Sequence, residues 1–318
     1  MAIYHLQRSL FATVFAVCFA QSVFSIEAPI TPGCDRTCLR TVTDQYLKAL
    51  LAHNPALAPM DSKVRYTENA ATVITGDGIW KTASSLREHQ QYYQDAMTGN
   101  ALFRGVLNET GVDTPAIVAI RIKAPAGKIT EVETIIARKG GHVTYTPDAL
   151  TTVDPRLTQV VPLDQRSTRE QLKTIVETYW DGITQHDSNI VLAAKGCDRF
   201  ENGRKVTNNT APGSSLTVQT DCAGSASRLT QISNVPERRY YLFDEEHGIV
   251  IGTFTLDIPP TPARPETPAT AGAPVQPATP ASAGRMPLIC EVFKVIDGKM
   301  QYIEATLLNM PYPTRSGW

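Results

Sequence analysis

The chain lacks any long hydrophobic run, and this absence limits how it can meet a membrane. Crossing a bilayer takes roughly 20 consecutive apolar residues, and the apolar stretch 10–20 is shorter. This stretch follows Arg8 and precedes the small residues Val23 and Ser25, the pattern of a cleaved secretory signal peptide over residues 1–25. We therefore expect a secreted or secretory-pathway protein without membrane contact after cleavage. An uncleaved N-terminal anchor is the alternative.

An excess of one charge is also lacking. The 30 Lys and Arg residues balance 31 Asp and Glu residues, for a net charge of −1, and no long run of like charge occurs. Nucleic-acid grooves and basic membrane faces need clustered cations, so neither is expected. The balanced charge favours a small or neutral partner.

Motifs of hydrolytic and metal chemistry are missing as well. No G-x-S-x-G elbow occurs, which argues against one large class of hydrolases. The cysteine spacings fit no zinc pattern. We expect neither a metal nor an organic cofactor.

Cysteines are few, and five of the six follow the signal peptide. In an oxidising compartment they allow at most two disulfides. We predict a bridge from Cys197 to Cys222 across a polar loop. A second bridge is predicted from Cys34 to Cys38, whose Cα spacing at a helix entrance is near the upper limit for a disulfide. Cys290 lies in an apolar segment and is predicted to be a buried free thiol. Sequons at Asn108 and Asn208 are compatible with glycosylation.

An internal repeat organises what is present. A shift of 133 residues lays an amphipathic segment with Leu39, Val42, Tyr46, Leu50 and His53 on one face onto a second with Leu172, Ile175, Tyr179, Ile183 and His186. The second segment begins with the form of a capping box at Ser167. From residue 39 to 73 the shift gives seven identities, where composition alone gives about two.

The ends of the two halves also correspond. Residues 122–135 and 293–307 are both typical of hairpins, now related by a shift of 171. The larger shift requires an insertion, and the Pro-rich stretch 259–287 supplies most of it as a flexible surface loop. The predicted domains are residues 34–147 and 166–318, joined by the linker 148–165.

Each half is predicted to be a helix followed by an irregular or helical middle and then several strands, which is the α+β class. We expect a middle helix at Ala83–Ala96. The expected strands are 102–107, 116–123 and 128–138 in the first half, and 238–244, 249–256, 288–295 and 299–308 in the second.

Several motifs resemble one family. They are Cys34-Asp-Arg-Thr-Cys38-Leu, Tyr66-Thr-Glu-Asn69, Gly76-Asp-Gly-Ile-Trp80, Cys197-Asp-Arg-Phe-Glu-Asn-Gly203 and the terminal Pro311-Tyr-Pro-Thr-Arg-Ser-Gly-Trp318. The chain resembles the nuclear transport factor 2-like superfamily, which includes ketosteroid isomerases and polyketide cyclases. Within it, the chain is most similar to a secreted two-repeat family of fungi and bacteria. The resemblance implies two tandem cone-shaped domains with a bent antiparallel sheet and an interior pocket.

The repeated pairs Glu68-Asn69 and Glu201-Asn202 are the sharpest catalytic candidates. A carboxylate in an apolar pocket has a raised pKa and can move protons, and a neighbouring amide can hold an enolate oxygen. The competing interpretation is structural, because such pairs also satisfy backbone groups in turns.

Four further residues share the opening helices, and two lie in a strand. His53 and His186 are candidate bases, although both sit near a helix end where the helix dipole alone favours them. Tyr46 and Tyr179 are candidates to contact substrate or simply core residues. Arg238 and Arg239 must face opposite sides of their strand, so one is expected to bind substrate. The alternative is an ordinary ion-pair network with Asp244, Glu245 or Glu304, or with Glu133 and Glu291, since buried carboxylates need partners.

We therefore expect a secretory-pathway isomerase, cyclase or dehydratase that transfers protons on a small hydrophobic or polyketide-derived molecule. The resemblance extends to fungal natural-product cyclases, including those that form maleidrides. The alternative is a non-catalytic secreted protein that binds a small molecule or a partner. A homodimer is compatible with both hypotheses.

Overall fold

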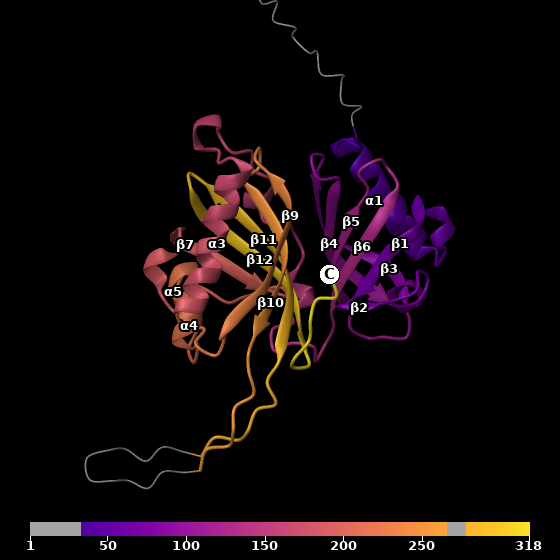
Figure 1. Ribbon diagram of the computed structural model, residues 1–318. Helices are drawn as coiled ribbons and strands as arrows, with labels where there is room; N and C mark the ends of the chain where they lie inside the picture. The colour runs from indigo at the N-terminus through magenta and orange to yellow at the C-terminus, as the bar shows by residue number, and fades with distance from the viewer. Residues whose placement is uncertain (1–32, 266–277) are drawn as a thin grey trace, which may run out of the picture. The chain divides into compact units, whose positions relative to one another are not determined.

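The computed structural model describes residues 33–265 and 278–318, so the predicted signal peptide lies outside the described residues. Each half of the described chain opens with a long helix and continues into a six-stranded sheet, as Figure 1 shows. The predicted α+β class is confirmed.

The first half contains α1 (Arg36–Leu51), β1 (Met60–Glu68), β2 (Ala71–Thr72), β3 (Ala83–Asp95), β4 (Asn100–Glu109), β5 (Ala116–Lys123) and β6 (Ile129–Ala137). The second contains α3 (Arg169–Gln185), β7 (Ala193–Glu201), β8 (Arg204–Lys205), β9 (Asn234–Asp244), β10 (Ile249–Asp257), β11 (Met286–Ile296) and β12 (Lys299–Met310). Three short helices complete the list: α2 (Pro155–Thr158), α4 (Leu216–Gln219) and α5 (Cys222–Ala226).

The two sheets have the same strand order, β2-β1-β6-β5-β4-β3 and β8-β7-β12-β11-β10-β9. Glu68 lies opposite Thr134, and Glu201 lies opposite Ala305. Glu68 and Glu201 are 133 residues apart, and their partners Thr134 and Ala305 are 171 residues apart, which are the two shifts found in the sequence. The β1–β6 and β7–β12 pairs are parallel, so each sheet is mixed, where a wholly antiparallel sheet was expected.

The amphipathic faces of the opening helices are buried as predicted. In α1 the buried face includes Leu39 and Tyr46, and in α3 it includes Leu172 and Tyr179. Each helix packs on one face of its own sheet and encloses a separate hydrophobic core. The capping box of α3 is formed by Thr168 and Gln171, one residue later than predicted.

A third apolar cluster joins the halves, with members such as Tyr93, Leu102, Tyr241 and Leu288 drawn from both sheets. Two ion pairs also join the halves, and each half supplies the arginine of one pair and the aspartate of the other. Arg36 at the start of α1 lies 2.5 Å from Asp244 of the second half, and Arg169 at the start of α3 lies 2.6 Å from Asp95 of the first. Since Arg36 and Arg169 are equivalent at the shift of 133, the halves contact each other through equivalent elements.

The predicted middle helix Ala83–Ala96 is wrong, because this segment is the 13-residue strand β3. From His89 to Asp95 its residues alternate between buried and half-buried. The buried side carries polar groups that find partners outside the first sheet, such as the Gln91 amide, which donates to Glu304 at 2.8 Å. Tertiary contacts thus override the local preference.

The described ends of the predicted insertion are paired with each other or belong to the sheet. Its described ends pair through isolated bridges, Ile258–Arg285, Thr261–Ser282 and Arg264–Thr279, and Met286 and Pro287 belong to β11. The prediction of a flexible surface loop also covers residues 266–277, which lie outside the described residues.

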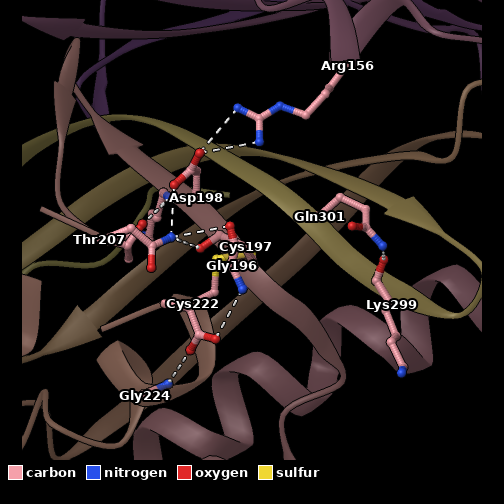
Figure 2. Close-up of a disulfide and its surroundings, with 12 residues drawn as sticks. Arg156, Gly196, Cys197, Asp198, Thr207, Cys222, Gly224, Lys299 and Gln301 are labelled. Carbon is pink, nitrogen blue, oxygen red and sulfur yellow. Dashed lines mark hydrogen bonds and ion pairs between the residues drawn. A yellow bond between two sulfur atoms is a disulfide. The ribbon is translucent and has the colours of Figure 1, made fainter. Parts of the chain in front are cut away.

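Both predicted disulfides are present, Cys34–Cys38 and Cys197–Cys222, and Cys290 is a buried free thiol. Figure 2 shows the second bridge between β7 and α5. The neighbouring Asp198 accepts from Arg156 of α2 at 3.4 Å. Within the described ranges, no helix is long and apolar enough to cross a membrane.

Candidate functional site

The asparagines of the two repeated pairs hold turns. Asn69 and Asn202 have φ angles of 47° and 45°, the left-handed conformation that Asn tolerates better than most residues. The Asn69 side-chain oxygen accepts from the Ile136 N–H at 2.8 Å, and that of Asn202 accepts from the Leu307 N–H at 3.0 Å. The amide nitrogens donate to backbone carbonyls as well. Both side chains therefore act as structural clamps between a turn and a strand.

Glu68 lies in a different environment, and we call the group Tyr46, Tyr66, Glu68, Trp80 and Thr134 the Glu68 site. The half-buried Glu68 carboxylate receives hydrogen bonds on one oxygen, Oε1, from the Tyr66 hydroxyl and from the Ile79 N–H, the latter at 2.9 Å. Burial raises the pKa of Glu68, and these hydrogen bonds only partly oppose the rise. A carboxyl group with a raised pKa is suited to accept and return a proton near neutral pH.

Three buried polar atoms of the Glu68 site have no hydrogen-bond partner in the described part of the chain: the Tyr46 hydroxyl, the Trp80 indole nitrogen and the Thr134 hydroxyl. Tyr46 and Trp80 are fully buried, and their rings meet edge to face with centroids 5.2 Å apart. The Tyr46 hydroxyl also lies close to the polar groups of Trp80, Tyr66, Thr134 and Glu68, so these groups face one another, and burial raises the pKa of Tyr46. Buried donors without partners are costly, so their grouping beside a carboxyl indicates a place for a polar ligand atom or water.

The loop after β2 covers Glu68. Gly78 has a φ of 63°, and a Cβ added there would lie 2.2 Å from the Glu68 Oε2 atom. Only glycine fits that position. The motifs 66–69 and 76–80 therefore converge, although the sequence showed them only as separate marks of a family.

The equivalent place in the second half carries more charge, and we call the group Tyr179, Arg199, Glu201 and Glu291 the Glu201 site. Arg199 is buried between the two carboxylates, and its Nε donates to Glu291 at 3.0 Å. Its Nη1 donates to Glu201. The second oxygen of Glu291 and the Tyr179 hydroxyl have no partner among the described residues.

The two carboxyls of the Glu201 site are pushed in opposite directions. Burial would raise the pKa of Glu201, but the charge and hydrogen bond of Arg199, together with His142 and the Thr144 hydrogen bond, outweigh it and lower that pKa. Burial raises the pKa of Glu291, which is completely buried, and Arg199 only partly offsets it. The pKa of Glu201 is thus lowered, whereas that of Glu68 is raised.

The candidate histidines lie on the surface. His53 and His186 are both exposed, and the His53 Nδ1 atom lies 2.5 Å from the Trp80 carbonyl oxygen. His186 ends α3 in the left-handed conformation. The structure brings neither imidazole to Glu68 or Glu201.

The candidate arginines form ion pairs on opposite sides of β9. Arg238 lies 2.5 Å from Glu177 and 2.8 Å from Asp181, both on α3. Arg239 lies 2.5 Å from Glu133 of the first half. Their predicted alternation is confirmed. The Arg239 partner Glu133 is one of the buried acids that the sequence suggested for these arginines, whereas the Arg238 partners on α3 were not predicted.

The sequon asparagines are engaged in hydrogen bonds. The Asn108 amide donates to Ser85 at 2.9 Å. The Asn208 amide donates to the carbonyls of Gly196 and Cys197 and to Asp198 at 2.9 Å. A glycan on Asn208 would replace some of these bonds.

Sequence reasoning missed Tyr66, Trp80 and Arg199 as parts of the sites. Tyr66 and Glu68 are two residues apart in one strand, so the alternation of side chains places both on one face. The same holds for Arg199 and Glu201. That signal was in the sequence, although the strands β1 and β7 were not predicted.

One cluster in the described residues brings together groups of the kind that bind metals, Asp244, Glu246 and His247, with ligand atoms within 4.8 Å of one another. Asp244 already pairs with Arg36 and accepts from the His247 ring at 2.8 Å. This arrangement fits an ion-pair network between the halves better than a cation site.

Two cavities lie apart from both sites. One, of about 280 Å³, is lined by residues such as Arg40, Tyr92, Leu157 and His247. The other, of about 690 Å³, lies beside the start of α3. Neither is lined by Glu68 or Glu201.

Comparisons with known proteins give the following matches. Residues 165–307 match the family described as the domain of unknown function DUF8021. No curated protein matches the chain. Among solved structures, an NTF2-like protein of unknown function from Cytophaga hutchinsonii is 10% identical over 31% of this chain and 89% of its own, with a TM-score of 0.26.

Two further structures carry functional descriptions. A protein described as a polyketide cyclase, from Xanthomonas campestris pv. campestris, is 14% identical over 44% of this chain and 92% of its own, with a TM-score of 0.29. AclR from Streptomyces galilaeus, described as a hydroxylase, is 10% identical over 47% of this chain and 87% of its own, with a TM-score of 0.31. The solved structures similar to this chain are thus NTF2-like proteins, polyketide cyclases and hydroxylases.

Proposed function

We propose that this protein is a proton-transfer enzyme, an isomerase, cyclase or dehydratase, whose working residues form the Glu68 site. The observation that carries the proposal is a half-buried carboxyl with a raised pKa beside unpartnered buried donors from Tyr46, Trp80 and Thr134. A carboxyl base whose pKa is raised by burial and a set of preorganised donors are two parts that favour proton abstraction next to a carbonyl.

In this mechanism Glu68 accepts a proton from a carbon adjacent to a carbonyl. The electron pair of the broken C–H bond moves to the carbonyl oxygen, and the Tyr46 and Trp80 donors stabilise the resulting enolate. Return of the proton from Glu68 to another carbon completes an isomerisation. In a cyclisation the enolate carbon attacks a second carbonyl carbon, the electron pair of that C=O π bond moves to its oxygen, and this oxygen takes the proton back from Glu68. Neither route needs an oxidant or a reductant.

The proposed substrate is a small hydrophobic carbonyl compound, such as a polyketide-derived molecule. The apolar core that surrounds the Glu68 site supports this class, since apolar walls with few polar groups are typical of small-molecule sites. A role in fungal natural-product biosynthesis, including maleidride cyclisation, extends the family resemblance of the sequence. The two disulfides support a protein that acts in the secretory pathway.

The test uses 3-cyclohexen-1-one, whose conversion to the conjugated 2-isomer is followed by ultraviolet absorbance. Glu68→Gln keeps the size of the side chain and removes the base, so the rate should fall by about 10²–10⁴-fold. The control is Glu88→Gln, on the exposed side of β3. A folded Glu68→Gln protein with the wild-type rate would exclude Glu68 as the base.

A binding protein without catalysis is the second candidate. It is favoured by the two cavities that lie away from both carboxyl groups. A wild-type protein that binds hydrophobic ketones or phenols but leaves C–H protons unexchanged in D₂O would support it. A homodimer also stays a prediction, and sedimentation of the purified chain tests it.

A further inference from the structure

We propose that Arg199 and Glu291 are specificity determinants, which exclude neutral hydrophobic ligands from the Glu201 site and confine them to the Glu68 site. This inference rests on the proposed function of the Glu68 site. It concerns how two copies of one fold in one chain came to differ.

The positions correspond closely. At the shift of 133, Tyr46 matches Tyr179, Tyr66 matches Arg199 and Glu68 matches Glu201. In the sheets, Ile120 lies opposite Thr134, and Glu291 lies opposite Ala305, so Ile120 matches Glu291 at the shift of 171. The second half thus keeps the tyrosine and the acid and replaces a tyrosine and an isoleucine by an arginine and a glutamate.

The two replacements compensate each other. The Arg199 side chain is 5% exposed and that of Glu291 is 0% exposed, and they join at 3.0 Å. A buried cation without its acid, or the acid without its cation, is strongly unfavourable. A neutral ligand that enters the site must separate the pair or leave it beside apolar surface, and it brings no charge in return. Among the described residues of the Glu68 site, the polar groups are a carboxyl group, three hydroxyls and an indole, without a buried ion pair.

The segment that follows β6 also covers the Glu201 site. The Thr144 hydroxyl donates to the Glu201 Oε2 atom at 3.2 Å, and the Thr144 carbonyl accepts from Asn202 at 3.0 Å. His142 contacts the same hydroxyl at 2.6 Å. Both oxygens of Glu201 are therefore occupied, whereas both hydrogen bonds of Glu68 reach its Oε1 atom.

The three tryptophans of the chain provide one reporter for each site and one control. Trp80 belongs to the Glu68 site, and Trp180 stacks edge to face on Tyr179 at 5.1 Å. Trp318 donates to Thr67, away from the interior of both cores. Labelling with 5-fluorotryptophan gives fluorine resonances that are assigned by single Trp→Phe variants.

The experiment titrates the full-length protein with 2-naphthol, a flat and weakly acidic hydrophobic probe. In the wild type we expect the Trp80 resonance alone to shift. In the double variant Arg199→Tyr with Glu291→Ile, which installs the residues of the first half, Trp180 should shift as well, and the number of bound probes should rise from one to two. Arg199→Met with Glu291→Leu is the second variant, because well-packed apolar residues often replace buried ion pairs without loss.

The reciprocal variant, Tyr66→Arg with Ile120→Glu, should abolish the Trp80 shift. The inference is overturned if wild-type Trp180 already responds to the probe, or if either folded double variant leaves Trp180 unmoved. Absence of a Trp80 response in the wild type would sink the proposed function instead. A gain of Trp180 response in the double variants would still support the role of Arg199 and Glu291.

Discussion

The ion pair between Arg104 and Glu304 joins the two halves, and its removal tests how they hold together. The two side chains are 0% and 3% exposed and meet at 2.6 Å. Arg104 also donates to the Thr306 hydroxyl at 2.8 Å, and Glu304 accepts from Gln91 at 2.8 Å. Arg104→Met keeps much of the volume and removes the charge, so it leaves Glu304 buried with one neutral donor.

The expected loss is large because the remaining charge stays buried. Removing one partner of a buried pair costs about 3–5 kcal/mol, which for a chain of this size lowers the melting temperature by about 6–20 °C. The double variant Arg104→Met with Glu304→Met removes both charges and should recover most of this loss. Lys81 and Asp77 form an exposed pair, so Lys81→Met should cost about 0–1 kcal/mol.

Urea unfolding of the four proteins, followed by tryptophan fluorescence, gives the free energies. The reasoning is refuted if Arg104→Met costs no more than Lys81→Met, or if the double variant is less stable than Arg104→Met.

Three further predictions concern single features of the fold. Replacing both Cys197 and Cys222 by Ala should lower the free energy of unfolding by about 3.5 kcal/mol, because their 25-residue separation closes a long loop. Removing the Cys34–Cys38 bridge, which closes a shorter loop, should cost about 2 kcal/mol. Equal losses of the two variants in urea unfolding would contradict this. Gly78→Ala should destabilise more than Gly111→Ala, since both have a positive φ but only Gly78 has atoms in the way, and the excess should disappear in a Glu68→Ala background. Burial raises the pKa of Glu68, so its ionisation opposes folding once the pH exceeds the value for the unfolded chain. Glu68→Gln should therefore gain stability relative to the wild type as the pH rises above about 4, and a relative loss on that rise would contradict the direction.

The duplicated architecture was largely predictable from the sequence. The apolar periodicity of α1 and α3 and the two shifts are local or repeated patterns, and burial of the helix faces follows from them. The disulfides were predictable because Cys34 and Cys38 lie within one helical turn and Cys197 and Cys222 flank one polar loop. In these cases the physical cause acts within a short stretch of chain.

Strand β3 shows where local patterns fail. His89, Gln91 and Asp95 are polar residues that alternate along a strand, yet all three are buried. Their burial depends on partners that come from distant segments, such as Glu304 for Gln91 and Arg169 for Asp95. The three glutamines and one glutamate of this segment favour a helix locally, and the distant partners override that preference.

The candidate sites divide in the same way. The sequence by itself determined that Glu68 and Glu201 are equivalent, because they occupy one position of a repeat. Only the tertiary structure decided that they differ, because β11 brings Glu291 to Arg199 in the second half, whereas the 76–80 loop covers Glu68 in the first. The pKa of a carboxyl group depends on the charges and burial within a few ångströms of it, and those neighbours are set by the folded chain.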